Sequence, residues 1–164
     1  MNATPPIHAP RATIVAAGEH APDFVLKDQN RSDWRLSEHV ARGDVVLCFF
    51  PMAFTDVCAT EMKCVTDEFD SWSRQGATVV GISCDSFAAL KAWSDSIGLK
   101  QTLLADMHRT VCKAYGAYWP DLNIAGRATV VIGRSPDGKG RVAWSQRREI
   151  KQAMDFGEVI ANLG

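Results

Sequence analysis

The sequence of 164 residues predicts an α/β domain with a mixed central β-sheet flanked by helices. Two short runs of strand-forming apolar residues, at 45–50 and 78–83, are each followed by a segment with apolar residues at helical spacing. Near the C-terminal end, a turn sequence at 136–138 separates two more strand-forming runs. We expect one domain over residues 18–164, preceded by an irregular arm over residues 1–17 that is poorly ordered at its start.

The first predicted strand, Val45–Phe50, is apolar throughout, as expected for a strand that is buried on both faces of a sheet. A helix is predicted over 59–75 and ends at Gly76, because glycine commonly follows the last turn of a helix. The apolar residues of this helix repeat at helical spacing: Met62, Val65, Phe69 and Trp72. The second buried strand, 78–83, follows and completes a β-α-β unit.

A second helix is predicted after this strand, where either Asp85 or Ser86 can cap it. Its apolar face carries Phe87, Leu90, Trp93 and Ile97. A shorter helix is predicted over about 108–115. Leaving out this short helix, the order of the main elements is β-α-β-α-β-β-α.

The turn Pro136-Asp137-Gly138 predicts a hairpin between the strands Ala128–Ile132 and Arg141–Ser145. A last helix is predicted over about 151–163.

Charge and composition exclude several classes of function. Eighteen Lys and Arg residues against nineteen Asp and Glu residues give a formal net charge of −1. Partners such as nucleic acid or an anionic membrane surface require a basic excess, so neither is expected. The longest apolar run is too short to span a membrane and the N-terminus lacks a secretory signal, so a soluble, cytoplasmic protein is predicted. The basic pair Arg147-Arg148 is predicted to lie on a solvated face.

The cysteines must be judged one by one. Their number is odd and their spacing irregular, which does not fit a secreted disulfide framework: Cys48, Cys58, Cys64, Cys84 and Cys112. The sequence contains no Cys-x-x-Cys motif, and its four histidines fall in no ligand pattern, so a zinc finger or ribbon is not expected.

Cys58 has the most informative neighbourhood. It follows a buried strand and lies in the first turn of an amphipathic helix, where free N–H groups and the helix dipole stabilise a thiolate. Thr55 lies three residues earlier, so that its hydroxyl can reach the sulfur or a substrate oxygen. Glu61 lies on the same helix face and requires a cation from elsewhere. By itself this context fits a reactive thiol and a small buried residue equally well.

The spacing Pro51-x-x-x-Thr55-x-x-Cys58, with Glu61 three residues later, resembles the active-site signature of the peroxiredoxins. Three further segments resemble the same family in the same order: 21–26, 80–86 and 126–132. The resemblance covers about residues 18–163. Among peroxiredoxins, the region after Lys113 is most similar to the one-cysteine alkyl hydroperoxide reductase E kind.

This resemblance implies a thioredoxin-like fold and a thiol peroxidase that reduces hydrogen peroxide or organic hydroperoxides without metal, haem or flavin. It also implies a thioredoxin-like or low-molecular-weight thiol as reductant, and a homodimer. Trp119, in the loop beside Pro120, is expected near the mouth of the site.

The resemblance also implies a role for each motif residue. The Cys58 thiolate attacks the peroxide and becomes a sulfenic acid. Thr55 and the Cys58 N–H hold the peroxide oxygens, and Arg127 supplies a fixed cation beside the sulfur. Glu61 orients Arg127, and Pro51 shields the sulfenic acid from water.

The route back to the thiol stays open between alternatives. We favour a one-cysteine enzyme reduced by an external thiol, because Cys64 lies about 9 Å along the helix from Cys58, beyond the ~7 Å reach of a disulfide. The alternatives are an internal disulfide from Cys58 to Cys84, or less favourably to Cys64, and a redox sensor without turnover. Cys48 and Cys112 are expected to serve packing. A disulfide oxidoreductase would require a second cysteine beside Cys58, where Val57 and Glu61 stand.

Overall fold

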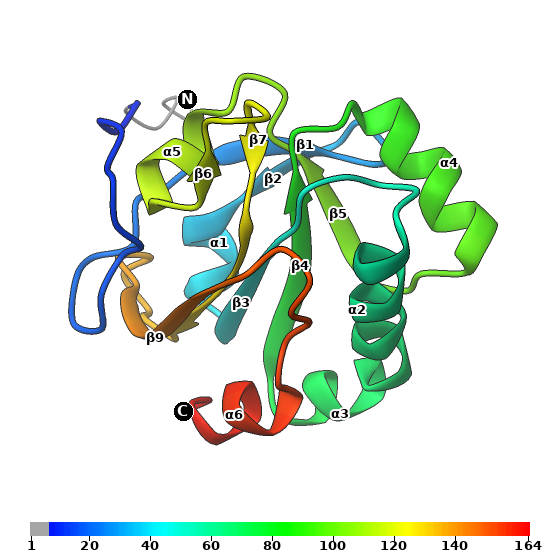
Figure 1. The fold of residues 1–164 in the computed structure, drawn as a ribbon. Helices are drawn as coiled ribbons and strands as arrows, with labels where there is room; N and C mark the ends of the chain where they lie inside the picture. The colour runs from blue at the N-terminus through cyan, green and yellow to red at the C-terminus, as the bar shows by residue number, and fades with distance from the viewer. Residues whose placement is uncertain (1–6) are drawn as a thin grey trace.

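A seven-stranded mixed sheet forms the centre of the computed structural model, which describes residues 7–164 (Figure 1). In spatial order its strands are β2 (Asp33–Arg35), β1 (Val25–Asp28), β5 (Thr102–Ala105), β4 (Ala77–Ser83), β3 (Asp44–Phe49), β8 (Arg127–Gly133) and β9 (Arg141–Arg148). Strands β5, β4 and β3 run parallel, whereas β1, β2, β8 and β9 join through antiparallel pairs. Two short strands, β6 (Tyr118–Trp119) and β7 (Ile124–Ala125), form a separate hairpin.

Helices cover both faces of the sheet, as Figure 1 shows. One face, called here the α5 face, carries α1 (Leu36–Val40) and α5 (Thr110–Tyr115). The other, called the α2 face, carries α2 (Asp56–Asp67), α3 (Phe69–Arg74), α4 (Phe87–Ile97) and α6 (Phe156–Ala161).

The alternation of side chains along β3 builds a separate core on each face. Leu47 and Phe49 pack on the α5 face, whereas Val46 and Cys48 pack on the α2 face. All four side chains are fully buried, as predicted for this strand. Two residues one position apart in a strand therefore belong to different environments.

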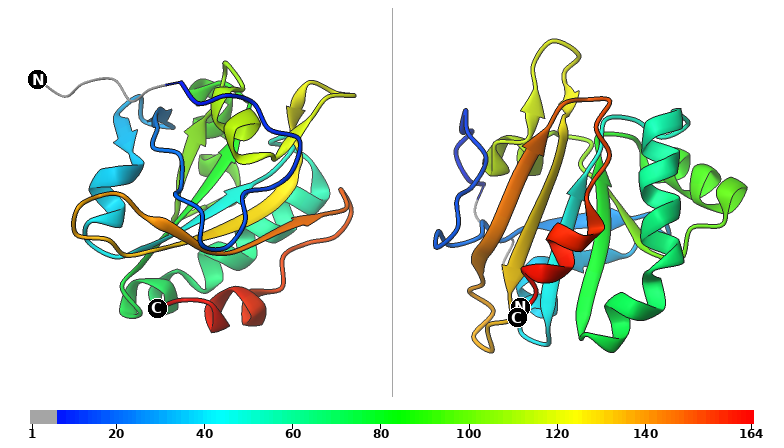
Figure 2. Two further views of the ribbon diagram at one scale, coloured as in Figure 1. Left: turned by 90° about the vertical axis from the view of Figure 1, so that its left-hand side faces the viewer. Right: turned by 60° about the horizontal axis from the view of Figure 1, so that its bottom comes forward.

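Residues 7–16 form no helix or strand and lie against the α5 face (Figure 2, left). The backbone N–H of Val15 donates to the carbonyl of Tyr115, and that of Arg11 to the carbonyl of Lys113. The expectation of poor order at the start of the arm falls on residues 1–6, outside the described residues.

The mixed α/β class, both buried strands and the C-terminal hairpin are confirmed. Ser86 is the cap of α4, since its hydroxyl oxygen accepts a hydrogen bond from the N–H of Ala89. The short strand β5 and the hairpin of β6 and β7 were not predicted.

Two predicted helices differ from the structure. The helix expected over 59–75 begins at Asp56 and is interrupted at Glu68, which separates α2 from α3. The last helix begins only at Phe156, because the backbone before it is bonded elsewhere: the N–H of Met154 donates to a buried carboxylate described below.

Gly81 lets α2 approach the sheet closely. A Cβ atom at this position of β4 would lie 2.8 Å from Cδ2 of Leu103 and 3.0 Å from the sulfur of Met62, a residue of α2. Both distances are shorter than ordinary van der Waals contacts, so a side chain here would push α2 outward.

Candidate active site

The loop between β3 and α2 is held in a fixed, strained shape. Its residue Phe54 has a φ of +63°, in the left-handed region that a bulky residue rarely adopts, and its ring is 64% exposed. The N–H of Ala53 donates to the Asp85 carboxylate at 2.9 Å, and the hydroxyl of Ser83 donates to the same oxygen at 2.7 Å. The end of β4 therefore anchors the loop from which α2 begins.

This loop places Cys58 in the first turn of α2. Thr55 occupies the N-cap position in an extended conformation, but its side chain makes no capping hydrogen bond: its hydroxyl donates to the carbonyl of Met52 at 2.8 Å. The first N–H groups of a helix have no partner within it, so those of the first turn remain available beside Cys58. Cys58 itself is only 1% exposed.

Arg127, the first residue of β8, reaches Cys58 from the sheet. Its Nη2 donates to the Cys58 Sγ at 3.2 Å, and its Nε donates to the carbonyl of Ile150 at 2.8 Å. With 2% exposure the guanidinium is fixed and largely dehydrated. The charge of an arginine does not change near neutral pH, so a permanent cation faces the sulfur.

Glu61 lies behind Arg127, one turn after Cys58 on α2. Its Oε1 is 3.5 Å from the Nη1 of Arg127, and its Oε2 accepts hydrogen bonds from the Nη2 of Arg148 at 3.2 Å and from the N–H of Met154 at 2.8 Å. Arg148 also donates to the hydroxyl of Thr129 at 2.8 Å. The carboxylate thus holds two buried arginines in place.

A buried cluster of charged side chains lies beside the Cys58 sulfur. Its two arginines and one carboxylate give it a formal charge of +1. Positive charge at this place is suited to stabilise negative charge that develops during a reaction.

Arg148 corrects the prediction that Arg147-Arg148 is a solvated pair. Arg147 is exposed, but Arg148 is buried and bonded to Glu61. The cause is a one-residue irregularity between β8 and β9: Ile132 pairs with Val142, but the next pair is Val131 with Trp144. A shift of one residue turns a strand's side chains to the other face, and here it sets Arg148 opposite Arg127.

Three of the predicted site residues are thus in direct contact: Cys58, Glu61 and Arg127. Pro51 is buried just after β3, and Thr55 occupies the N-cap position of the helix that carries Cys58. Trp119 lines a hollow of about 600 Å³ together with Arg127, Arg147 and Gln152, which agrees with its expected place near the site.

The other cysteines lie in different surroundings. Cys48 belongs to the same core as Cys58, but burial raises the pKa of its thiol well above the ordinary range. Cys64 is half-buried on α2. Cys84 and Cys112 belong to the core of the α5 face, across the sheet from Cys58.

Comparisons with known proteins point to one family. The AhpC/TSA family matches residues 17–142. Alkyl hydroperoxide reductase E of Mycobacterium tuberculosis is 34% identical over 124 residues, which are 74% of this chain and 81% of the relative. Chloroplastic peroxiredoxin Q of Triticum aestivum is 33% identical over 154 residues, which are 91% of this chain and 68% of the relative. Among solved structures, peroxidoxin BcpB from Mycobacterium tuberculosis superposes with a TM-score of 0.75 at 27% identity, covering 84% of this chain and 90% of that one.

Proposed function

This chain belongs to the AhpC/TSA family of peroxiredoxins, and from that membership we propose how its cluster of Cys58, Arg127, Glu61 and Arg148 reduces peroxides. The chain has a thioredoxin-like fold and is a thiol-dependent peroxidase, as its relatives are. The assignment of steps to individual residues is our proposal.

In the first step the Cys58 thiolate attacks one oxygen of the hydroperoxide. A sulfur–oxygen bond forms as the oxygen–oxygen bond breaks, so the sulfur is oxidised to a sulfenic acid by two electrons. The departing oxygen takes up the proton that the thiol released and leaves as water or an alcohol. No external cofactor is needed for this balance.

Arg127 serves this step by holding positive charge where negative charge moves from sulfur to oxygen. The N–H groups at the start of α2 and the Thr55 hydroxyl are suited to hold the two peroxide oxygens in line with the sulfur. Glu61 and Arg148 act as positioning residues, because they contact Arg127 or each other rather than the sulfur. Pro51, buried beside the loop, is proposed to limit the access of water to the sulfenic acid.

The observation that carries this proposal is the 3.2 Å contact between the Arg127 Nη2 and the Cys58 Sγ. It is tested by adding one equivalent of hydrogen peroxide in the presence of dimedone and mapping the adduct by mass spectrometry. We expect the adduct on Cys58. An adduct confined to another cysteine would overturn the assignment.

We propose that an external thiol, either thioredoxin-like or of low molecular weight, returns the sulfenic acid to the thiol. Two observations support this route. Cys84 packs on the opposite face of the sheet from Cys58, and Cys64 shares a helix with it at a spacing that a disulfide cannot bridge without unwinding. In the peroxide experiment without dimedone, a disulfide that includes Cys58 would contradict this route.

We further propose a cytoplasmic homodimer. The described residues include no helix that is long and apolar enough to cross a membrane.

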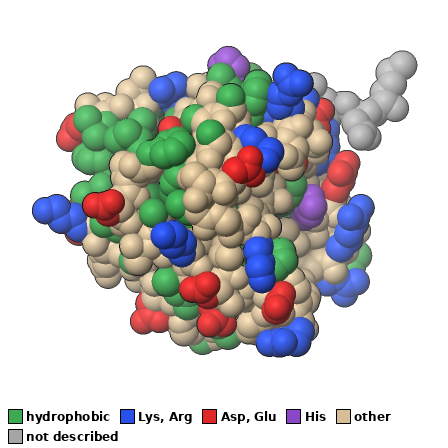
Figure 3. All heavy atoms as spheres, turned by 90° about the vertical axis from the view of Figure 1, so that its right-hand side faces the viewer, with side chains coloured by type: hydrophobic (Ala, Val, Ile, Leu, Met, Phe, Trp, Pro, Cys, Tyr) green, Lys and Arg blue, Asp and Glu red, His purple; other side chains and the backbone are tan. Residues whose placement is uncertain are grey.

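The dimer is proposed from the exposed hydrophobic side chains. They gather in one region of the face on which α2 and α4 lie (Figure 3), and Met52 and Phe54 of the β3–α2 loop are exposed. Light scattering of the wild type and of Phe54→Asp tests the dimer, which the substitution is expected to weaken. Cell fractionation tests the compartment.

A further inference from the structure

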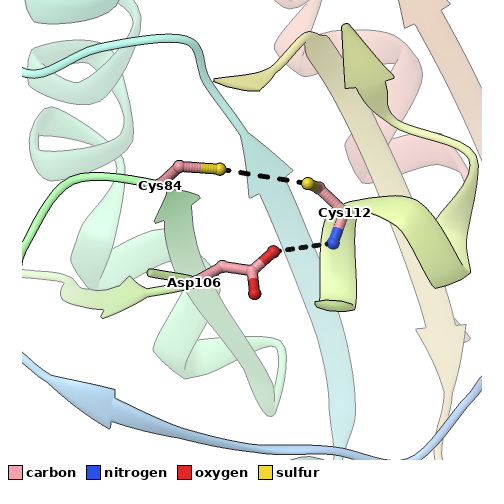
Figure 4. A group of neighbouring side chains, drawn as sticks. All are labelled: Cys84, Asp106 and Cys112. Atoms are coloured by element: carbon pink, nitrogen blue, oxygen red, sulfur yellow. Dashed lines mark hydrogen bonds between the residues drawn. The ribbon is translucent and has the colours of Figure 1, made fainter. Parts of the chain in front are cut away.

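Two further thiols, those of Cys84 and Cys112, lie close together outside the peroxidase site. Cys84 follows the end of β4, and Cys112 is in the first turn of α5. Their sulfurs point toward one another across the space between these elements, 3.9 Å apart (Figure 4). The two residues are 28 positions apart in the sequence, so the contact is a product of the fold.

The two thiols are not equivalent. Cys84 is half-buried, and the hydrogen bond that it shares with Cys112 lowers the pKa of its thiol. Cys112 is fully buried, and the same hydrogen bond, together with burial and the nearby Asp106 carboxylate, raises the pKa of its thiol. Cys84 is therefore the accessible thiol that ionises first, and Cys112 is the one that keeps its proton.

Asp106 lies beside the two cysteines, but its carboxylate stabilises the start of α5. One carboxylate oxygen accepts the N–H of Val111 at 3.2 Å and the other accepts the N–H of Cys112 at 2.8 Å, so Asp106 satisfies the start of α5. The three side chains together offer one carboxylate and two sulfurs within 4.8 Å of one another. Because the carboxylate is already engaged with the helix, the geometry favours chemistry between the two sulfurs over coordination of a metal ion.

We propose that Cys84 and Cys112 form a redox-active dithiol, separate from the peroxidase site, which hydroperoxide oxidises to an intramolecular disulfide independently of Cys58. The Cys84 thiolate attacks the peroxide, the oxygen–oxygen bond breaks, and the leaving oxygen departs as water or an alcohol with the proton lost by Cys84. Cys112 then attacks the sulfenic sulfur, a sulfur–sulfur bond forms, and the hydroxyl leaves as water with the proton of Cys112. Two thiols and one hydroperoxide thus give one disulfide, one water and one alcohol or second water.

Closure of this disulfide requires little movement. The sulfurs must approach by about 2 Å to reach the bond length of ~2.05 Å. Cys84 lies in a bend between β4 and α4, so its side chain is the one that can turn, whereas Asp106 fixes the backbone of Cys112. The disulfide would tie the β4–α4 connection to α5, which is the element against which the N-terminal arm packs.

The test uses Cys58→Ser, so that its outcome does not depend on the proposed peroxidase mechanism. The variant is treated with excess hydrogen peroxide, its free thiols are alkylated, and its peptides are mapped without reduction. We expect a mass loss of two hydrogens and a linkage between the peptides of Cys84 and Cys112, both reversed by dithiothreitol.

Matched variants distinguish the two thiols. In Cys58→Ser/Cys112→Ala the same treatment should leave a Cys84 sulfenic acid that dimedone traps, with no disulfide. In the otherwise native chain, Cys84→Ser should retain full peroxidase turnover with an external thiol, and circular dichroism checks that each variant folds.

Three results would overturn the proposal. The first is complete alkylation of both Cys84 and Cys112 after peroxide. The second is a disulfide that joins either of them to a different cysteine. The third is tight binding of Cd²⁺ by the reduced protein, seen as thiolate absorption that Cys84→Ser removes, without any disulfide after peroxide. That last result would assign the pair to a metal site instead.

Discussion

The two faces of the sheet each bury a cysteine close to a carboxylate, but they provide opposite electrostatic surroundings. On the α2 face, Arg127 stands between Cys58 and Glu61 and contacts both. On the α5 face the Asp106 carboxylate lies near the Cys112 thiol and raises the pKa of that thiol. Burial is nearly the same, since both sulfurs belong to residues that are at most 1% exposed.

Burial alone does not decide whether a cysteine reacts. A buried thiol without a cation keeps its proton, because a dry interior penalises the thiolate. At Cys58 a fixed guanidinium contacts the sulfur, and at the other pair the hydrogen bond between the two thiols lowers the pKa of only the more exposed one. Substitutions on the two faces of the sheet test this contrast.

Cys58→Ser should abolish peroxidase turnover while the fold is retained, because a serine hydroxyl does not ionise near neutral pH. Steady-state peroxide consumption with an external thiol measures the loss, and Cys84→Ser is the matched control on the α5 face. If Cys58→Ser kept more than a trace of turnover, or if Cys84→Ser lost it as completely, the two faces would not differ as we argue.

Arg127→Lys should slow the reaction with peroxide by about a hundredfold, since a point charge cannot replace a planar group that contacts sulfur, Glu61 and the carbonyl of Ile150 together. Stopped-flow measurement of the rate with hydrogen peroxide gives the effect. Alkylation of Cys58 by iodoacetamide at pH 7 should slow in parallel. An unchanged alkylation rate would show that the arginine does not affect the reactivity of the sulfur.

Much of the site on the α2 face could be predicted from the sequence, but the pairing of cysteines on the α5 face could not. The spacing of Pro51, Thr55 and Cys58 and the position of Arg127 belong to local motifs, and the resemblance to peroxiredoxins identified them. The contact between Cys58, Glu61 and Arg127 follows from that resemblance and is present in the structure.

The remaining features depend on tertiary register, which a local pattern does not contain. Arg148 faces Glu61 only because the β8–β9 ladder shifts by one residue, and nothing in the hairpin sequence marks where that shift occurs. The pairing of Cys84 with Cys112 depends on how α5 packs beside β4. The strand β5 is short, and its apolar core of Leu103 and Leu104 is too brief to distinguish a strand from a loop.

Glu61→Gln should destabilise the protein by about 3 kcal/mol, because it leaves two buried arginines without a counter-charge. For a chain of this size that corresponds to a fall in the midpoint of thermal unfolding of roughly 6–12 °C. Asp106→Asn is the matched change on the α5 face. It removes only part of a helix cap and should cost about 1 kcal/mol. Equal losses in the two variants would contradict the idea that the carboxylates have different roles.

Cys48→Ser should lower stability by about 1–3 kcal/mol, because it places a hydroxyl in the core of the α2 face where a thiol packs without polar demands. The activity per folded molecule should stay near that of the wild type. Urea unfolding and peroxide consumption, measured on the same sample, separate the two effects. A loss of specific activity at full folding would mean that Cys48 takes part in the chemistry of its neighbour.

The stability of the protein should depend slightly on pH through His39. The charges around Cys58 that come from Arg127 and Arg148 are permanent, but the α5 face also carries His39, which is half-buried and stacked on Trp34 at 4.3 Å. Burial, and then the nearby Arg42, lower the pKa of His39 below its ordinary value of 6.5. A lowered pKa in the folded state means that the unfolded chain binds the proton more tightly, so stability is fully present above pH 6.5 and decreases as the pH falls below it. We therefore expect the temperature midpoint of unfolding to fall more steeply between pH 7 and pH 5 in the wild type than in His39→Gln. The difference should be small, because the ring is partly exposed. Parallel midpoint curves for the two proteins would show that His39 contributes nothing to the pH dependence.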